Sequence, residues 1–362
     1  MAKSRDYTRE EDKTLVFVFL LIGFGLVMVY STSSYKAGMM FGNPAYWFLR
    51  QTVWAVIGSG VMLMISRFDY KKLEKKPKLL LVLYIGMSFL LILTLVLGSV
   101  TKGSKRWLSL GPFSFQPSEL SKLVLILFFA RVLSKKERLG RKLKGTFLFL
   151  LLSLAIVGPV AVENASTSII LLAIVGLMIF AACPWYKRFF LMLFLGAGMI
   201  AVIIGSRAYR MERFVIWLDP EHHPKGLQTI QGLYAIGSGG LFGKGLGNSM
   251  QKMGFLPEPQ NDMIFSIICE ELGLAGAFFV LGLFALLLFH FLKIALQCED
   301  LFGFLIVVGV MAHLGVQLFI NIAVVTNTIP NTGIPLPFIS YGGSSLFFLL
   351  TEIGFVLSVA KH

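Results

Sequence analysis

The stretch TLVFVFLLIGFGLVMVYSTS, residues 14–33, runs for twenty residues without a charged side chain. A helix needs about 20 predominantly apolar residues to cross the hydrocarbon core of a bilayer, so this stretch predicts a membrane-spanning helix. Basic residues precede it, as in a secretory signal peptide: Lys3, Arg5, Arg9 and Lys13. The apolar run is longer than that of a typical signal peptide and further spans follow, so we expect an uncleaved anchor.

Segments of similar character recur along the whole chain. The sequence is 56% hydrophobic and 14% charged, whereas soluble globular chains are about 45–50% apolar and about 25% charged. We therefore predict an all-α integral membrane protein with about ten transmembrane helices, built as one polytopic domain over residues 1–362. A net charge of +14 would indicate nucleic-acid binding on a soluble protein, but on a membrane protein it reports topology. The further predicted spans are 46–65, 79–98, 119–133, 146–162, 166–182, 187–205, 262–290, 302–326 and 345–360.

Positive charge in short loops predicts the orientation of the chain. Loops 66–78 and 131–145 carry six and seven basic residues, on the same side as the N-terminal tail. Because short basic loops stay on the cytoplasmic side, we expect both termini in the cytoplasm. The large loop 206–261, between the seventh and eighth spans, then faces outward. It is rich in glycine and proline with little strand alternation, and such loops often display functional residues.

Ionisable residues at membrane depth are costly and mark candidate functional sites. Glu119 and Lys122 lie three residues apart at the start of the fourth span, so they share a helix face and can pair. The alternative for each such residue is a buried, paired group with a structural role. The other acidic candidates are Glu163, Glu270, Glu271 and Glu352, and we interpret His290 and His313 as packed or interfacial side chains.

Asp262 is the strongest candidate for chemistry. In LPEPQNDMIFSIICEELG, Pro257 and Pro259 prevent a helix, so Asp262 stands at the start of the eighth span. One interpretation is a plain N-cap, since aspartate accepts a backbone N–H at that position. The other is a carboxylate at the outer mouth of the bundle, facing a substrate cavity. The sequence supports both interpretations of Asp262 equally.

Glycines and basic residues surround this aspartate in the sequence. The stretch GSGGLFGKGLGNS, residues 237–249, lacks the GxxxxGK[ST] pattern of a phosphate-binding loop and follows no strand. It is either a flexible loop or a backbone surface that lets a bulky anionic substrate approach closely. The large loop 206–261 has six basic residues, of which we single out Arg207, Arg210, Arg213, Lys244 and Lys252.

Three blocks of sequence resemble the SEDS proteins (shape, elongation, division and sporulation), the RodA/FtsW/SpoVE group of bacterial cell-wall polymerases. They are KRWLSLGPFSFQPSELSKL at 105–123, YAIGSGGLFGKGLGNSMQKMGFLPEPQNDMIFSIICEELG at 234–273 and NTGIPLPFISYGGSS at 331–345. The resemblance covers most of the chain, and the wording of the second block favours a division-type or sporulation-type member. One departure is ENAST at 163–167, where many members carry a PDLGT-like turn, which puts a substrate role for this turn in doubt.

The resemblance implies a glycosyltransferase that polymerises lipid II at the outer face of the cytoplasmic membrane. Asp262 matches the family's essential loop aspartate, and Glu119 with Lys122 matches the Glu and Lys of its QPSELxKL block. Other residues match further polar positions of these blocks: Lys105, Arg106, Gln116, Glu258 and Glu270.

The expected reaction moves a growing glycan from its polyprenyl pyrophosphate to the 4-hydroxyl of an incoming lipid II. We assign Asp262 as the general base on that hydroxyl, a role typically worth about 10²–10⁴-fold. Attack opposite the leaving pyrophosphate would invert the anomeric centre and give a β-1,4 bond. The leaving group needs compensating positive charge. The candidates for this role are Lys122, Arg106, Arg207, Arg210 and Arg213. A divalent cation (Mg or Mn) is the alternative source of this charge, although the sequence shows no metal-ligand spacing.

Two other functions fit a polytopic chain with buried charges. The first is a lipid II flippase that forms no bond, and it predicts polar groups through the full depth of the bilayer. The second is a scaffold for a transpeptidase. The resemblance itself implies a class B penicillin-binding protein as partner, a role compatible with polymerase activity.

Overall fold

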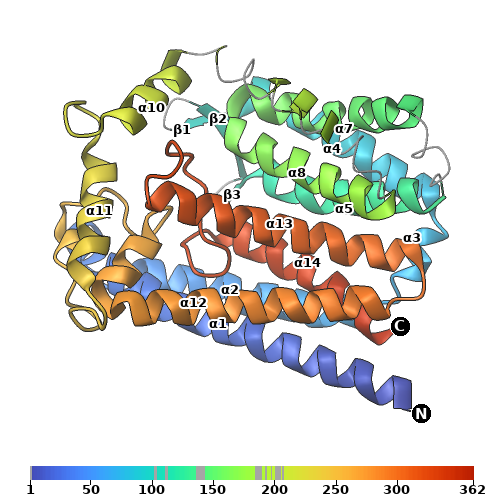
Figure 1. The fold of residues 1–362 in the computed structure, drawn as a ribbon, viewed down its shortest axis with the longest axis horizontal. Helices are drawn as coiled ribbons and strands as arrows, with labels where there is room; N and C mark the ends of the chain where they lie inside the picture. Colours follow the sequence, from blue (N-terminus) through green and yellow to red (C-terminus); the bar gives the residue numbers. More distant parts are fainter. Residues whose placement is uncertain are drawn as a thin grey trace.

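The computed structural model describes residues 2–101, 104–110, 113–135, 143–183, 190–191, 194–196, 198–199, 205 and 208–362. Most of these residues form long helices that run side by side (Figure 1). The helices are α1 (Ala2–Phe41), α2 (Tyr46–Ser66), α3 (Lys71–Glu74), α4 (Pro77–Leu97), α5 (Pro117–Lys135), α7 (Leu143–Glu163), α8 (Ala165–Ala182), α10 (Ala208–Leu218), α11 (Leu227–Gly239), the 3₁₀ turn η1 (Gln251–Met253), α12 (Ile264–Gln297), α13 (Leu301–Val325) and α14 (Gly343–Lys361).

The helical fold class expected from the sequence is confirmed. Among the described residues, seven helices are long and apolar enough to cross a membrane: α1, α2, α4, α8, α12, α13 and α14. The predicted spans 119–133 and 146–162 also fall within helices, α5 and α7. The predicted span 187–205 lies mostly outside the described part of the chain. The count of ten therefore stays a prediction.

A small antiparallel sheet departs from the all-α expectation. Strands β1 (Ser99–Thr101), β2 (Ser104–Leu110) and β3 (Phe113–Phe115) pair in the order β1-β2-β3 between α4 and α5. Helix α4 ends at Leu97, and the extended backbone of the following Gly98 leads the chain into the first strand. The three strands are too short to leave a periodic pattern in a sequence dominated by helical spans, so the sheet was not predicted.

The loop 206–261 also contains more regular structure than we expected. Helices α10 and α11 and the turn η1 lie within it. Helix α10 carries Arg213 and Trp217, and α11 carries Gln228, and these side chains reach the candidate site described below. The loop thus contributes side chains to that site.

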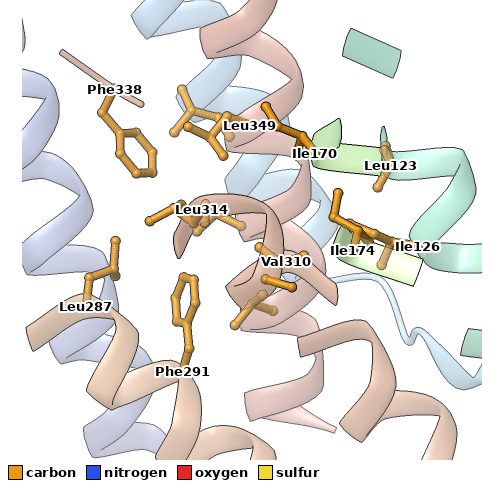
Figure 2. Packing of buried hydrophobic residues seen from close by; sticks show 14 of the residues in the cluster. Leu123, Ile126, Ile170, Ile174, Leu287, Phe291, Val310, Leu314, Phe338 and Leu349 are labelled. Atoms are coloured by element: carbon orange, nitrogen blue, oxygen red, sulfur yellow. The ribbon is translucent and has the colours of Figure 1, made fainter. Parts of the chain in front are cut away.

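Helix α13 lies at the centre of the bundle, against α5, α8, α12 and α14. Figure 2 shows its buried Val310 and Leu314 packed between aromatic and aliphatic side chains of α12 on one side and of α5 and α8 on the other. At Gly309 a Cβ would lie 2.7 Å from the side chain of Ile126, so the glycine lets α13 approach α5 closely. Small residues serve this purpose in membrane bundles, where close packing rather than water exclusion joins the helices.

Two polar contacts between α1 and α12 are separated by a length of helix that is close to the thickness of a bilayer core. At one end Glu10 pairs with His290, and at the other the Ser31 hydroxyl donates to Glu271 at 2.7 Å. The intervals of 21 residues on α1 and 19 on α12 correspond to about 32 and about 29 Å of helix. Both lengths match the roughly 30 Å hydrocarbon core of a bilayer. Both termini lie at the Glu10 end and α11 lies at the other, here termed the α11 end (Figure 1).

Candidate functional site

Residues 326–342, between α13 and α14, form turns and extended backbone without a helix or strand. This stretch, termed the site segment, is nevertheless partly buried, with Ile334, Leu336, Phe338 and Ile339 in the core. Buried backbone groups need hydrogen-bond partners, and irregular backbone at membrane depth is tolerated only inside protein. The partners of the site segment therefore show what it is built to hold.

Two carboxamides of α13 bind the middle of the site segment. Gln317 Nε2 donates to the carbonyl of Pro335 at 3.0 Å, and Asn321 Nδ2 donates to the carbonyl of Ile334 at 2.8 Å. The Asn321 Nδ2 group also donates to the backbone carbonyl of Asp262 at 2.8 Å. One helix thus joins the site segment to the start of α12.

The first half of the site segment is bound from α8 and α10. The Ser166 hydroxyl donates to the carbonyl of Thr332 at 2.9 Å. Arg213 donates to the carbonyl of Asn331 at 3.1 Å, and the Trp217 indole donates to that of Asn327 at 2.9 Å.

The second half is bound by α2 and by the residues that precede α12. The Ser340 hydroxyl donates to the carbonyl of Asn261 at 2.6 Å, and the amide of Tyr341 donates to that of Gln260 at 2.9 Å. Gln51 of α2 donates to the carbonyl of Ser340 and accepts from the amide of Gly342. The residues on the N-terminal side of Asp262 are therefore fixed to the site segment.

Backbone strain is concentrated in the same region. In the described part of the chain, the non-glycine residues with positive φ are Glu258, Asn327 and Phe338, at 47°, 54° and 61°. Left-handed backbone is unfavourable for such residues and tends to occur at functional sites, where the surrounding structure enforces it. Here all three lie in the site segment or just before Asp262.

Asp262 does not occupy the N-cap position of α12. The N-cap position is Met263, whose side chain makes no capping bond, so the interpretation of Asp262 as a plain N-cap is wrong. The half-buried carboxylate instead lies beside Gln228 of α11, whose amide nitrogen is 3.4 Å from each carboxylate oxygen. A Cβ at Gly333 would lie 3.9 Å from Asp262 Oδ2, so the site segment passes next to the carboxylate. Asp262 thus stands where α11, α12 and the site segment meet.

The predicted pairing of Glu119 and Lys122 is confirmed. Lys122 Nζ lies 3.0 Å from Glu119 Oε1, and the lysine side chain is only 2% exposed. Lys122 also donates to Gln317 Oε1 at 3.3 Å, which links the pair to α13. Behind Gln317, His313 of α13 contacts Glu352 of α14, so these two residues are a buried polar pair, as one interpretation held.

The arginines near the site contact backbone at the end of α7. Arg106 donates to the carbonyl of Glu163 at 2.9 Å, and Arg210 donates to the carbonyls of Ala161 and Val162 at 2.8 and 2.7 Å. Both bind carbonyls that the helix terminus leaves without an intrahelical partner. Lys105 lies in β2, but its side chain, like the whole of Arg207, falls outside the described part of the chain.

Two further predicted residues contribute to local structure. Gln116 lies just before α5 and donates to the Ser118 hydroxyl at 2.9 Å. The Glu258 carboxylate accepts from the side chain of Asn261 at 2.8 Å, within the strained turn that precedes Asp262.

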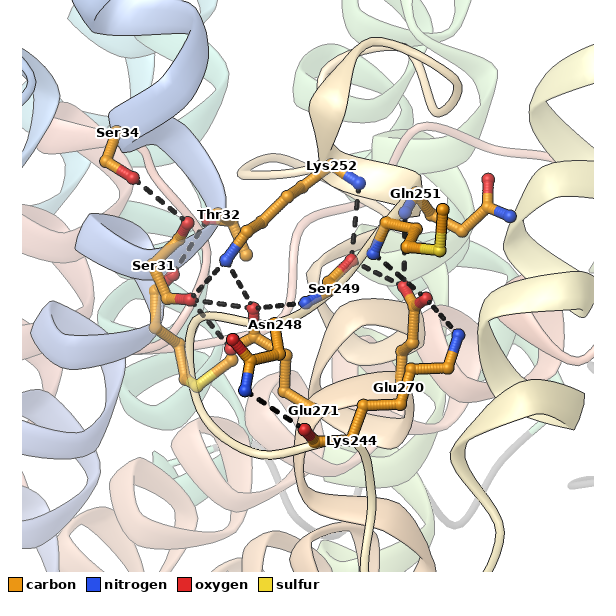
Figure 3. A network of polar contacts seen from close by, with 12 residues as sticks. Ser31, Thr32, Ser34, Lys244, Asn248, Ser249, Gln251, Lys252, Glu270 and Glu271 are labelled. Atoms are coloured by element: carbon orange, nitrogen blue, oxygen red, sulfur yellow. Dashed lines mark hydrogen bonds and ion pairs between the residues drawn. The ribbon is translucent and has the colours of Figure 1, made fainter.

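Glu270 belongs to a different network from Asp262. It is eight residues further along α12, roughly 12 Å away by helical rise. Figure 3 shows its carboxylate among Lys244, Ser249 and the backbone of the glycine-rich loop, the stretch 237–249. The neighbouring Glu271 is bound to Ser31 and Lys252. Both carboxylates are completely buried. Because their partners lie in the loop and in α1, this network connects the loop to α12 and α1.

The glycines of this loop allow it to dock on a break in α12. At Gly273 the backbone is left-handed, with φ of 66°, and the free amides of Leu274 and Ala275 donate to the carbonyls of Gly240 and Leu241. A Cβ at Gly243 would lie 2.2 Å from the carbonyl oxygen of Glu271. The glycines therefore allow the loop to approach α12 closely. This packing role explains the glycine content of the stretch, and no contact with a substrate is needed to explain it.

Sequence reasoning did not identify Gln317 and Asn321. Their signal is two carboxamides four residues apart in an apolar span, a spacing that places both on one helix face.

No group of three or more His, Cys, Asp or Glu side chains that could hold a metal ion occurs among the described residues.

The chain is similar to proteins of bacterial cell-wall synthesis. A family profile described as "cell cycle protein", covering FtsW, RodA and SpoVE, matches residues 12–362. Stage V sporulation protein E of Bacillus subtilis is 39% identical over 96% of both chains, and a probable peptidoglycan glycosyltransferase FtsW of Geobacter sp. is 37% identical over 96% of both. A solved structure described as structural coordination of polymerization and crosslinking by a peptidoglycan synthase complex matches with a TM-score of 0.79 and 28% identity, over 96% of both chains.

Proposed function

This chain belongs to the FtsW/RodA/SpoVE family of cell cycle proteins, and from that membership we propose that it is a peptidoglycan polymerase that joins lipid II units into β-1,4 glycan strands. The observation that carries the proposal is the position of Asp262. Its carboxylate lies beside Gln228 and the site segment, at the α11 end of a membrane bundle. A partly buried carboxylate at the place where three elements meet suits a polar acceptor that approaches from one side of the membrane.

Asp262 acts as the general base in this proposal. A sugar hydroxyl is a weak nucleophile at neutral pH, and a carboxylate within hydrogen-bond reach of the 4-hydroxyl takes its proton as the glycosidic bond forms. The oxygen attacks the anomeric carbon opposite the departing polyprenyl pyrophosphate, so the configuration inverts. Pyrophosphate leaves without being protonated, and a second catalytic carboxylate is not needed, unlike in glycoside hydrolases.

Lys122 is the cation that best suits the leaving pyrophosphate. It is held by Glu119 and Gln317, and Gln317 also binds the site segment that passes Asp262. Preorganised positive charge placed where charge develops stabilises the transition state. Arg213 is the second choice, because it binds the site segment directly. Arg106 and Arg210 act mainly by holding the end of α7 against the site.

We place the chain in the bacterial cytoplasmic membrane, with the α11 end facing outward and a class B penicillin-binding protein as its partner. The apolar helices support the first part, and the basic loops 66–78 and 131–145 support the orientation. The similar peptidoglycan synthase complex coordinates polymerization with crosslinking, which supports a transpeptidase partner.

The experiment is a polymerisation assay with purified protein and lipid II in detergent. We expect glycan ladders from the wild type and none from Asp262→Asn, with the variant still folded as judged by its melting temperature. Ladders of normal intensity from Asp262→Asn would refute the assignment of the base. If the wild type forms no glycan but moves lipid II across liposomes, the flippase alternative replaces the polymerase.

A further inference from the structure

Gln317 and Asn321 lie one turn apart on α13, and both are almost completely buried, at 3% and 0% exposure. Their amide nitrogens donate to the carbonyls of two consecutive residues of the site segment, Pro335 and Ile334. Two buried carboxamides on one helix thus bind two consecutive peptide carbonyls of the site segment.

Each carboxamide also binds one of the two charged residues of the site, Gln317 at the ammonium group of Lys122 and Asn321 at the backbone of Asp262. Gln317 Oε1 accepts from Lys122 Nζ at 3.3 Å, and Asn321 Nδ2 donates to the carbonyl of Asp262 at 2.8 Å. Hydrogen bonds and one short stretch of backbone therefore link Lys122 to Gln317, Gln317 to the carbonyl of Pro335, and, through the adjacent carbonyl of Ile334, Asn321 to Asp262. Helix α13 thus contacts both the side chain of Lys122 and the backbone of Asp262.

The orientation of the Gln317 amide follows from its partners. Its nitrogen must face the carbonyl of Pro335, so its oxygen faces Lys122 and the Nε2 atom of His313, at 2.8 Å. Because an amide oxygen only accepts, His313 Nε2 carries a hydrogen. The other ring nitrogen, Nδ1, lies 2.6 Å from Glu352 Oε2, a contact that requires one proton between them. With that proton the His313–Glu352 pair is neutral overall, and its Nε2–H fixes the Gln317 amide.

We propose that Gln317 and Asn321 are positioning residues for the glycosyl transfer proposed above, and that the His313–Glu352 pair holds Gln317 in the orientation that binds Lys122. The inference rests on the proposed function. Lipid II itself does not contact these buried groups. Their loss lets Lys122 and Asp262 shift relative to each other, and misplacement of reacting groups by about 1 Å can lower turnover by about 100-fold. The effect therefore falls on kcat more than on KM.

The test compares variants of similar size in the purified full-length chain. Asn321→Leu and Gln317→Met remove the donors and keep most of the volume. Phe319→Leu is the matched control, because this residue lies between them on α13 and is 70% exposed. Glu352→Gln is the conservative variant, since its amide can donate to His313 Nδ1 and leave the Nε2–H in place, whereas Glu352→Leu cannot.

We expect Asn321→Leu and Gln317→Met to lower kcat for lipid II polymerisation by roughly 10- to 100-fold, with KM close to that of the wild type. Glu352→Gln should keep most of the activity that Glu352→Leu loses. A kcat unchanged in both α13 variants would overturn the proposal. Equal losses in the two Glu352 variants would overturn the role assigned to the His313–Glu352 pair.

Hydrogen exchange gives a readout that does not depend on catalysis. The amides of residues 331–341 should exchange faster in Asn321→Leu and Gln317→Met than in the wild type or Phe319→Leu. Unchanged exchange would overturn the positioning role even if kcat falls. If Asp262→Asn polymerises lipid II normally while exchange in 331–341 behaves as expected, the proposed function fails and the structural part of the inference stands.

Discussion

The pair Lys252–Glu271 gives a test of how strongly a buried ion pair holds the η1 turn, which follows the glycine-rich stretch 237–249, to the bundle. Lys252 Nζ lies 2.6 Å from Glu271 Oε1, and the two side chains are 4% and 0% exposed. The change is Lys252→Met, which keeps the length and the apolar stem of the side chain but removes its charge. It leaves the Glu271 carboxylate buried without its cation.

The size of the effect follows from what Glu271 retains. Removing one partner of a buried ion pair typically costs about 3–5 kcal/mol. Here the Ser31 hydroxyl still donates to the carboxylate at 2.7–2.8 Å, and the amide of Ser249 lies 3.4 Å from it. Because these donors stabilise the remaining charge, we expect a loss of about 3 kcal/mol in the free energy of unfolding, at the lower end of that range. The double variant Lys252→Met/Glu271→Gln should recover most of it, because it leaves no unpaired charge.

The assay is unfolding in mixed micelles by titration with SDS, followed by tryptophan fluorescence. The chain offers a matched control in Lys225–Glu212, where Nζ lies 2.8 Å from the carboxylate but the lysine is 67% exposed. Water solvates that pair, so Lys225→Met should leave stability unchanged. If Lys252→Met and Lys225→Met unfold at the same SDS fraction, burial does not govern the strength of these pairs and the reasoning is refuted.

Three further outcomes can be measured. Gly243→Ala should destabilise more than Gly247→Ala in the same titration: both have positive φ, but only at Gly243 would the new Cβ meet backbone, at 2.2 Å. Lys122→Ala should lower the rate of polymerisation at saturating lipid II, since charge compensation for the leaving group is lost; unchanged kinetics would remove this lysine from the site. The hydrogen bond to Asp219 favours the charged imidazole and raises the pKa of His222; the contact is present at pH below the raised pKa and is lost as pH rises through it, and because the pair is exposed it adds little to the stability of the fold. NMR titration should show the pKa of His222 fall in Asp219→Asn, and an unaltered value would contradict the pairing.

The sequence predicted the parts of the fold that depend on composition and local spacing. Uncharged runs of about 20 residues identified the helices, and the three-residue interval between Glu119 and Lys122 predicted their ion pair. Asp262 was identified as the central residue of the candidate site, although its alternative role as an N-cap was wrong. These signals depend only on residues close together in the sequence, so they can be interpreted without knowledge of tertiary contacts.

The contacts made by Gln317 and Glu270 could not be predicted in the same way. Gln317 binds Pro335, which lies eighteen residues further along the chain, and an amide in an apolar run does not indicate which carbonyl it meets. Glu270 matched a polar position of a block that also contains Asp262, yet its partners are Lys244 and Ser249, and the network faces a different element. A shared motif placed these acidic residues together in sequence, whereas helical rise separates them in space.

The site segment combines two properties that otherwise conflict, irregular backbone and burial inside a membrane protein. Its prolines, Pro330, Pro335 and Pro337, have no backbone N–H, so fewer donors need a partner. Its carbonyls then remain, and side chains of α8, α10 and α13 donate to them: Ser166, Arg213, Trp217, Gln317 and Asn321. An unsatisfied polar group in such a place costs several kcal/mol, so each of these donors both stabilises the segment and restricts its position. The same bonds that make irregular backbone tolerable at this depth therefore also fix the environment of Asp262, and substitutions among these donors should affect stability and turnover together.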